Sequence, residues 1–217
     1  TGLEHLSGAR EVNGVYILKD RLIEKVDTID EDSVRRSIKE MNIFAERFGG
    51  STSLMLIPTA AEIYRDKLPK GAPGIAQKEQ IDRIYGQVRN ISTIDAYSSL
   101  MSNAQKLIFY RSDHHWTSFG AYLGYSSMSK QLGYTPVPAE RFNVEHASHR
   151  FRGSLYNRII YDRVGPDPID LYTYGDSSHV NKVEIFDGKE WTEASDIYFR
   201  EYLNQNIRCF WGRASRL

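Results

Sequence analysis

The stretch from Tyr110 to Gly120, YRSDHHWTSFG, places an acid, two histidines and a tryptophan at four consecutive positions. In an extended segment alternate side chains share one face, so Asp113 and His115 are expected to point one way and His114 the other. A carboxylate beside a histidine can hold the proton on Nδ1 and leave Nε2 to act as a general base. The spacing therefore favours an acid–histidine pair.

Two other interpretations of this stretch stay open. The acid and the histidines could hydrogen-bond the turn of a polar corner while Trp116 fills the core. A metal site is the third interpretation, but adjacent histidines chelate poorly. Help would have to come from His146 and His149, whose i,i+3 spacing suits a helix that the surrounding sequence does not indicate. We therefore expect no metal here.

Length and composition set limits on the remaining function classes. The chain has 217 residues, of which 41% are hydrophobic, enough for one sizeable domain. Lys plus Arg and Asp plus Glu each total 28, so the chain has no net charge. Its overall charge therefore does not indicate binding to nucleic acid or to an anionic membrane surface. The single cysteine, Cys209, excludes an internal disulfide framework and a multi-cysteine zinc site. No apolar run approaches the roughly 20 residues that cross a bilayer.

Hydrophobic periodicity predicts helices and short strands that alternate from about residue 14 to 132. Apolar residues from Val34 to Phe48 recur at steps of three and four, and Gly49 follows them, which predicts a helix over 31–48. The run TSLMLIPT is typical of a strand buried on both faces. The other expected elements are a hairpin over 15–26, short helices in AAEIYRDKLP and over 78–88, strands in ISTIDAYSSL and KLIFYR, and a helix over 117–132. This alternation favours a mainly parallel sheet covered by helices.

After Gly133 the pattern changes, because prolines interrupt short segments. DLYTYG and KVEIFDGKEWT are typical of strands, with a turn at Asp187-Gly188. We expect an antiparallel extension that packs on the first region.

Several segments carry a family resemblance. YRSDHHWTSFGAYLGY resembles the bacterial family named after its Asp-His-His-Trp motif, and NGVYILKDRLIE, DKLP and FRGSLYNRI resemble other segments of that family in the same order. The resemblance covers nearly the whole chain. That family is similar in turn to the SGNH-hydrolase-like proteins of alginate and cell-wall polysaccharide O-acetylation. In those relatives Asp and His work with a later serine to move an acetyl group onto a sugar hydroxyl.

The resemblance implies a three-layer, SGNH-hydrolase-like (flavodoxin-like) α/β fold with a mainly parallel sheet. Residues 1–217 would form one incomplete domain, with an α/β part over about 14–132 and a strand-rich extension over about 133–205. Asp113 would orient the base His115, and His114 inherits no role.

Three residues that flank the pair are candidates for substrate contacts, namely Tyr110, Arg111 and Trp116. Tyr110 could instead complete the packing of its strand, Arg111 could be solvated, and Trp116 could belong to the core or to a cleft wall.

The nucleophilic serine is not obvious in this chain. Gly175-Asp176-Ser177 looks like the Gly-Asp-Ser block of SGNH enzymes, but it follows a half-polar strand and precedes another strand, whereas such a serine should open a helix. Ser154 in FRGSLY is a weaker candidate. In the family the nucleophile follows the segment resembled by IYFREYLNQ, so we expect it beyond Leu217. The last residues, NIRCFWGRASRL, depart from the family pattern, as a truncation or a reading-frame change would cause.

The resemblance thus implies an extracytoplasmic O-acyltransferase or esterase, secreted or anchored at the cell envelope, that acts on a surface carbohydrate. Its chemistry would pass through an acyl-serine with no metal or organic cofactor. A carbohydrate or acyl ester would be the substrate, a membrane-bound acyl-donor protein is a candidate partner, and no nucleic acid is expected. The alternative is a non-catalytic carbohydrate-binding or scaffold protein of the envelope.

Overall fold

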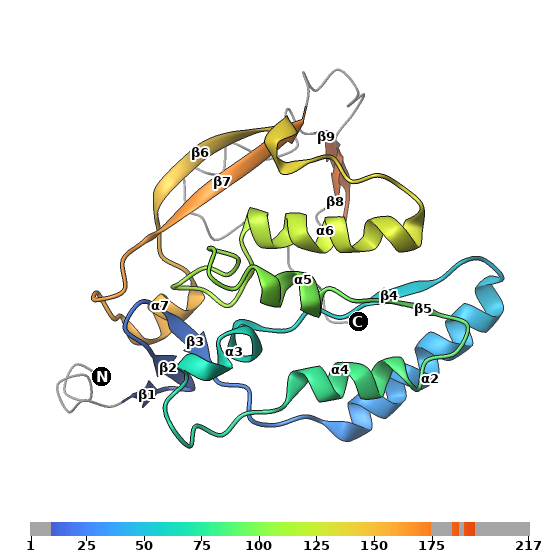
Figure 1. The fold of residues 1–217 in the computed structure, drawn as a ribbon, viewed down its shortest axis with the longest axis horizontal. Coiled ribbons are helices and arrows are strands. Elements are labelled where there is room, and N and C mark those ends of the chain that lie inside the picture. The colour runs from blue at the N-terminus through green and yellow to red at the C-terminus, as the bar shows by residue number, and fades with distance from the viewer. Residues whose placement is uncertain (1–9, 175–183, 187–188, 194–217) are drawn as a thin grey trace.

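The computed structural model describes residues 10–174, 184–186 and 189–193 of the chain, which form a mixed α/β fold (Figure 1). Its strands are β1 (Glu11–Val12), β2 (Val15–Ile17), β3 (Leu22–Glu24), β4 (Ser53–Met55), β5 (Ser92–Ile94), β6 (Phe142–Phe151), β7 (Asp167–Tyr174), β8 (Glu184–Phe186) and β9 (Trp191–Glu193). Its α-helices are α2 (Glu31–Phe48), α3 (Ala60–Ile63), α4 (Gln77–Tyr85), α5 (Tyr97–Ser102), α6 (Ser118–Leu132) and α7 (Ser154–Ile159). Two 3₁₀ turns, η1 (Arg65–Lys67) and η2 (Ala139–Arg141), complete the described elements.

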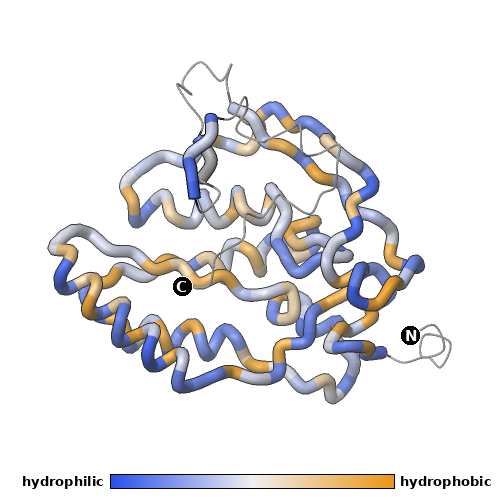
Figure 2. Tube along the Cα trace, turned by 180° about the vertical axis from the view of Figure 1, so that it is seen from behind, coloured by the Kyte–Doolittle hydropathy of each residue, from blue (hydrophilic) through white to orange (hydrophobic). Residues whose placement is uncertain are grey.

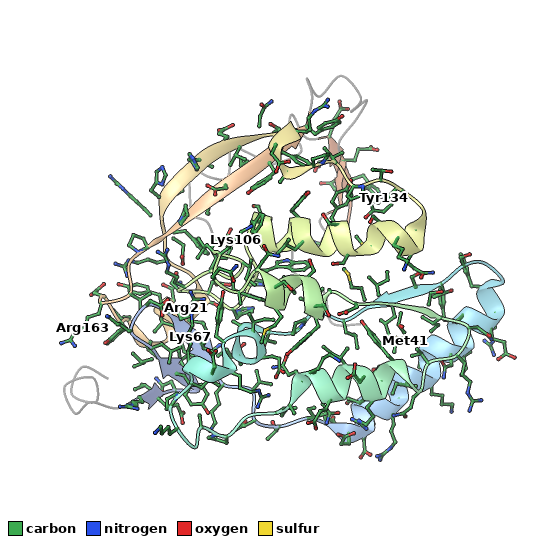
Figure 3. All side chains as sticks on the ribbon, in the orientation of Figure 1. Arg21, Met41, Lys67, Lys106, Tyr134 and Arg163 are labelled. Atoms are coloured by element: carbon green, nitrogen blue, oxygen red, sulfur yellow. The ribbon has the colours of Figure 1, made fainter. Side chains whose placement is uncertain are left out.

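The N-terminal strands form a small antiparallel sheet in the order β1-β2-β3, which confirms the predicted hairpin. Next to this sheet, Arg21 and Lys67 both lie over the ring of Tyr64, with Cζ of Arg21 3.8 Å from the ring centroid (Figure 3). The backbone N–H of Leu22 donates to the carbonyl oxygen of Arg111 at 2.7 Å. The hairpin therefore supports the segment that carries the Asp-His-His-Trp motif.

Helix α2 has the predicted bounds and ends at Gly49 as expected. The Asp30 side chain accepts from the N–H groups of Asp32 and Ser33, and Gly49 ends the helix at a φ of 66°, a conformation that glycine adopts without strain. Its hydrophobic residues alternate with hydrophilic ones along the helix (Figure 2). The hydrophobic face of the helix is nevertheless only partly covered by other elements. Phe44 and Phe48 stack on each other, and each remains more than half exposed.

Strands β4 and β5 form a parallel pair that lies between α6 on one side and α4 with α2 on the other (Figure 1). The Tyr85 hydroxyl ties α4 to both strands, since it accepts from the N–H of Leu56 and donates to the carbonyl oxygen of Ile94, each at 2.8 Å. The strand expected in TSLMLIPT is confirmed, but its residues are half-buried or exposed and are not covered on both faces. The part of the parallel sheet that the structure describes has two strands.

The strand predicted in KLIFYR is wrong. Residues 107–111 make one isolated bridge with the loop that follows them, between Phe109 and Trp116. Its two backbone bonds run from the N–H of Tyr110 to His115 and from the N–H of Thr117 to Ile108. Ile108, Phe109 and Tyr110 are buried all the same. The apolar run is a core segment whose backbone groups pair with its own return loop. Helix α5, directly before it, was not predicted.

Helix α6 confirms the prediction over 117–132, and Thr117 caps it by accepting from the N–H of Gly120. Gly120 lets the first turn approach the preceding segment, because a Cβ there would lie 2.3 Å from the carbonyl oxygen of Ile108. Gly124 lies against the ring of Trp116 in the same way. The motif loop is therefore held between α6 and the core.

The expected antiparallel extension is confirmed by two strand pairs. Strands β6 and β7, which are connected through α7, form a long antiparallel pair that arches over α6, and β8 pairs with β9 (Figure 1). Strand β6 contains EHASH, for which no element was predicted. The predicted turn at Asp187-Gly188 and Cys209 lie outside the described residues. Among the residues placed in the structure, no helix is both long enough and apolar enough to span a membrane.

Candidate active site

Asp113 and His115 are in direct contact. The Nδ1 atom of His115 lies 2.5 Å from Oδ1 of Asp113, and the same oxygen accepts from the backbone N–H of His115 at 2.9 Å. The Asp113 side chain is buried, whereas about a third of the His115 side chain is exposed. This contact fixes the ring so that Nδ1 faces the acid and Nε2 is directed away from it.

The second oxygen of Asp113 is held by the segment FRGS. The backbone N–H of Ser154, at the start of α7, donates to Oδ2 of Asp113 at 2.6 Å. Gly153 packs so closely on the carboxyl that a Cβ there would lie 2.3 Å from the Cβ of Asp113. Burial raises the pKa of Asp113, but hydrogen bonds from Ser154 and His115 outweigh it and hold this pKa below its usual value. The acid is therefore ionised at neutral pH.

His114 does not point away from His115, so that expectation is wrong. The two rings are 3.9 Å apart between centroids, and Nδ1 of His114 lies 2.8 Å from the hydroxyl of Ser154. The alternation rule fails because residues 111–115 form a bend and not an extended strand. His114 packs on the ring of His115, and the Ser154 hydroxyl contacts His114 at the same place.

Ser154 does not complete a catalytic triad with His114. In a triad the acid bonds one ring nitrogen and the hydroxyl bonds the other. Here the hydroxyl contacts Nδ1 of His114, and this same nitrogen lies 3.8 Å from Oδ1 of Asp113. The Ser154 hydroxyl therefore does not take the position that a triad with His114 would require. The role of its neighbour Gly153 was missed in the sequence, since a glycine in a loop has many possible reasons and the close approach depends on a distant residue.

The three flanking candidates are placed differently from one another. Tyr110 is buried against Phe151, with ring centroids 4.9 Å apart, and burial raises its pKa to about 12. One side of Tyr110 borders a small cavity of about 150 Å³. Arg111 is half-buried, and Trp116 packs on Gly124 next to the main core cluster. Packing thus explains Tyr110 and Trp116, while a substrate contact stays a prediction for all three.

One group of possible metal ligands occurs among the described residues, namely Asp113, His114 and His115, whose ligand atoms lie within 4.8 Å of one another. The two Nδ1 atoms in this group already contact Asp113 and Ser154. His146 and His149 lie on strand β6 and not on a helix, and His146 contacts Asp170. The two histidine pairs are therefore separate.

The other two nucleophile predictions concern residues outside the described part of the chain. Ser177 lies there, so its distance from His115 stays a prediction, as does a serine beyond Leu217.

Comparisons with known proteins place this geometry in a family. The DHHW protein family matches residues 8–196. A DHHW family protein from Eubacterium siraeum is 23% identical with a TM-score of 0.66, over 76% of this chain and 56% of that one. PatB1 of Bacillus cereus is 18% identical with a TM-score of 0.68, over 84% and 66% of the two chains. The O-acetyltransferase domain of Pseudomonas putida AlgJ is 20% identical with a TM-score of 0.56, over 74% and 64%.

These likenesses show a shared fold. The chain spans 56–66% of the length of the structures it matches. None of the curated proteins matches it.

Proposed function

Because this chain belongs to the DHHW protein family, we propose that it is part of an SGNH-like O-acyltransferase or esterase that acts on a cell-surface carbohydrate. The observation that carries the proposal is the 2.5 Å contact between Asp113 and Nδ1 of His115. An ionised, buried acid in that position is what a histidine needs to act as a base. The likeness to the AlgJ O-acetyltransferase domain supports acyl transfer as the reaction.

In the proposed mechanism Asp113 keeps the proton on Nδ1 of His115, and Nε2 takes the proton of a serine hydroxyl. The serine oxygen attacks the acyl carbonyl, and the alcohol of the donor ester leaves with the proton returned from Nε2. In the second half Nε2 removes a proton from a sugar hydroxyl, whose oxygen attacks the acyl carbonyl. The bond to the serine oxygen breaks, and Nε2 returns the proton to that oxygen, which restores the serine and the base. Water in place of the sugar makes the reaction an ester hydrolysis.

The finer features are part of the same proposal. The serine is Ser177 or a residue that follows Leu217 in the whole protein. The parallel strands β4 and β5 belong to a larger, mainly parallel sheet, which forms the middle layer of a three-layer fold of the SGNH type. Tyr110, Arg111 and Trp116 border the substrate. The protein works outside the cytoplasm and takes its acyl group from a membrane-bound donor protein.

The test is His115→Ala in the whole protein, with turnover of a small acetyl ester as the measurement. Loss of the general base should lower kcat by about 10²–10⁴-fold while the circular dichroism spectrum stays unchanged. The matched control is His149→Ala, which removes an exposed histidine on β6 and should leave kcat as it is. Unchanged kinetics in His115→Ala would remove the assignment.

A second measurement separates this enzyme from a non-catalytic carbohydrate-binding protein. A fluorophosphonate probe should label a serine of the whole protein, and His115→Ala should suppress the labelling because the hydroxyl then lacks its base. A binding protein would not react with the probe in either form.

A further inference from the structure

We propose that Asp167 is a positioning residue for the Asp113–His115 pair and acts through Ser112 and Gly153. The role of the pair itself rests on the proposed function. Asp167 opens strand β7, is fully buried, and lies more than fifty residues along the chain from the motif. Neither the motif nor the family match assigns it a role.

Asp167 holds the backbone directly before the catalytic acid. Its Oδ2 accepts three hydrogen bonds, from the backbone N–H of Arg111 at 2.9 Å, from the backbone N–H of Ser112 at 3.1 Å and from the Ser112 hydroxyl at 2.8 Å. These donors occupy the two positions that precede Asp113. One carboxylate oxygen therefore fixes the direction in which the chain enters the motif.

The Ser112 hydroxyl carries the contact to the other side of Asp113. It donates to Asp167 and accepts from the backbone N–H of Gly153 at 3.2 Å. Gly153 packs on the Asp113 carboxyl, and the next residue, Ser154, donates to its Oδ2. A continuous path thus runs from Asp167 through Ser112 to the two residues that touch Asp113.

The path joins three segments that are distant in sequence: the motif loop, the start of α7 and the start of β7. A purely structural tie would need only to bring these segments together. The apolar contacts of Phe151, Ile169 and Tyr110 already join the end of β6, strand β7 and the residue before the motif loop. Burying a carboxyl group is costly, and here desolvation raises the pKa of Asp167. The acid is better explained by directional hydrogen bonding than by packing.

The central experiment compares Asp167→Ala with Asp167→Asn. The alanine variant loses all three contacts to Oδ2. The asparagine variant keeps a carbonyl oxygen there and puts its nitrogen at the position of Oδ1, for which no hydrogen-bond partner is found among the described residues.

Asp167→Ala should raise the pKa of the Asp113 carboxyl, measured by ¹³C NMR, because the Ser154 N–H is no longer held against it. It should also lower kcat of the whole protein about 100-fold, as a misplacement of about 1 Å does. In Asp167→Asn, both the pKa of Asp113 and kcat should stay close to their wild-type values.

The matched control for general destabilisation is Leu171→Ala, which removes a buried side chain from the same strand. It should lower the melting temperature without moving the pKa of Asp113. An Asp167→Ala protein that melts earlier but keeps the wild-type pKa of Asp113 would overturn the inference. If Asp167→Ala does not fold, Ser112→Ala interrupts the same path and must raise that pKa.

This experiment also separates the inference from the proposed function. A whole protein that turns over no acetyl ester but whose Asp113 pKa rises in Asp167→Ala would support the positioning path and reject the reaction. Normal turnover in Asp167→Ala, with an unchanged pKa, would reject the path and leave the reaction standing.

Discussion

The two oxygens of the Asp113 carboxyl have different hydrogen-bond partners. Oδ1 faces the ring and the backbone N–H of His115, while Oδ2 accepts from the backbone N–H of Ser154. A carboxylate held by several donors in a buried site is stabilised in its ionised form, despite the cost of desolvation. Two single-residue changes test this arrangement.

The first change is Asp113→Asn, tested by the pH dependence of stability. The pKa of Asp113 is lowered in the folded protein from a usual value of 3.8. Its ionised form therefore stabilises the fold above that usual value, and this stabilisation is lost as the pH falls through the folded pKa. The wild-type protein should lose more unfolding free energy than Asp113→Asn between about pH 7 and pH 3, measured by urea denaturation. The raised pKa of Asp167 acts with the opposite sign, but it is present in both proteins and cancels in the comparison. Equal losses would show that the Asp113 contacts do not favour the ionised acid.

The second change is Gly153→Ala. The φ of Gly153 is −88°, which alanine adopts readily, so backbone strain plays no part. The new Cβ would lie 2.4 Å from Oδ2 of Asp113 and must displace the carboxyl. We expect a loss of about 1–3 kcal/mol of unfolding free energy, together with reduced turnover.

The matched control is Gly165→Ala, in an exposed turn where no atom lies within 4 Å of the added Cβ. Its unfolding free energy should be unchanged or slightly raised. Similar losses in both variants would show that Gly153 makes no special approach to Asp113.

At the scale of elements, helix α6 positions the motif by pressing on the segment that precedes it. Its first turn crosses Ile108 at Gly120, and its second turn packs Gly124 on Trp116. The cap residue Thr117 strengthens this junction, because its hydroxyl also donates to the carbonyl oxygen of Leu107 at 2.7 Å. The start of α6 thus contacts residues on both sides of the motif loop, namely Leu107 and Ile108 before it and Trp116 at its end.

The change Gly120→Ala tests this junction through the sign of its effect. In an ordinary helix, glycine to alanine stabilises by about 1 kcal/mol. Here the added Cβ would lie 2.3 Å from the carbonyl oxygen of Ile108 and 2.9 Å from the Cβ of Trp116. We expect a destabilisation of about 1–3 kcal/mol in urea unfolding. Gly86→Ala, at the end of α4 with no contact below 3.5 Å, is the control and should be neutral or mildly stabilising. A stabilised Gly120→Ala protein would refute the close approach.

At the scale of the whole molecule, the N-terminal sheet and α7 share one hydrophobic cluster. It is formed by Val12, Val15, Leu22, Leu155, Ile159 and Val164. The ion pair between Arg158 and Glu24 lies at its edge. Because α7 also presents Ser154 to the motif acid, this cluster connects the hairpin to the site.

The change Leu155→Ala tests this connection. Leu155 is fully buried in the cluster, so its truncation should cost about 2–5 kcal/mol. Hydrogen exchange should also become faster at the amide of Ser154, because the start of α7 loses its anchor. Ile160→Ala at the end of the same helix is the control, since that side chain is 65% exposed and its loss should cost no more than about 0.5 kcal/mol. Unchanged exchange at Ser154 in a destabilised Leu155→Ala protein would separate the cluster from the site.

Local patterns in the sequence determined the elements whose signals lie within one segment. The regular apolar spacing and the following Gly49 predicted the bounds of α2, and the helix predicted over 117–132 agrees with α6. The contact between Asp113 and His115 was predicted because both belong to one short loop, but the alternation argument wrongly placed His114 on the opposite side.

Tertiary structure decided everything that depends on partners distant in the chain. The apolar run at 107–111 has the composition of a strand but lies in the core as an irregular segment, because its backbone groups pair with its own return loop. Phe44 and Phe48 have helical spacing, yet no described element covers them. Ser154 and Asp167 reach the motif from 40 to 56 positions away, and hydrophobic periodicity carries no information on such contacts. The sequence by itself predicted that Asp113 and His115 meet, and only the fold decided what holds them in place.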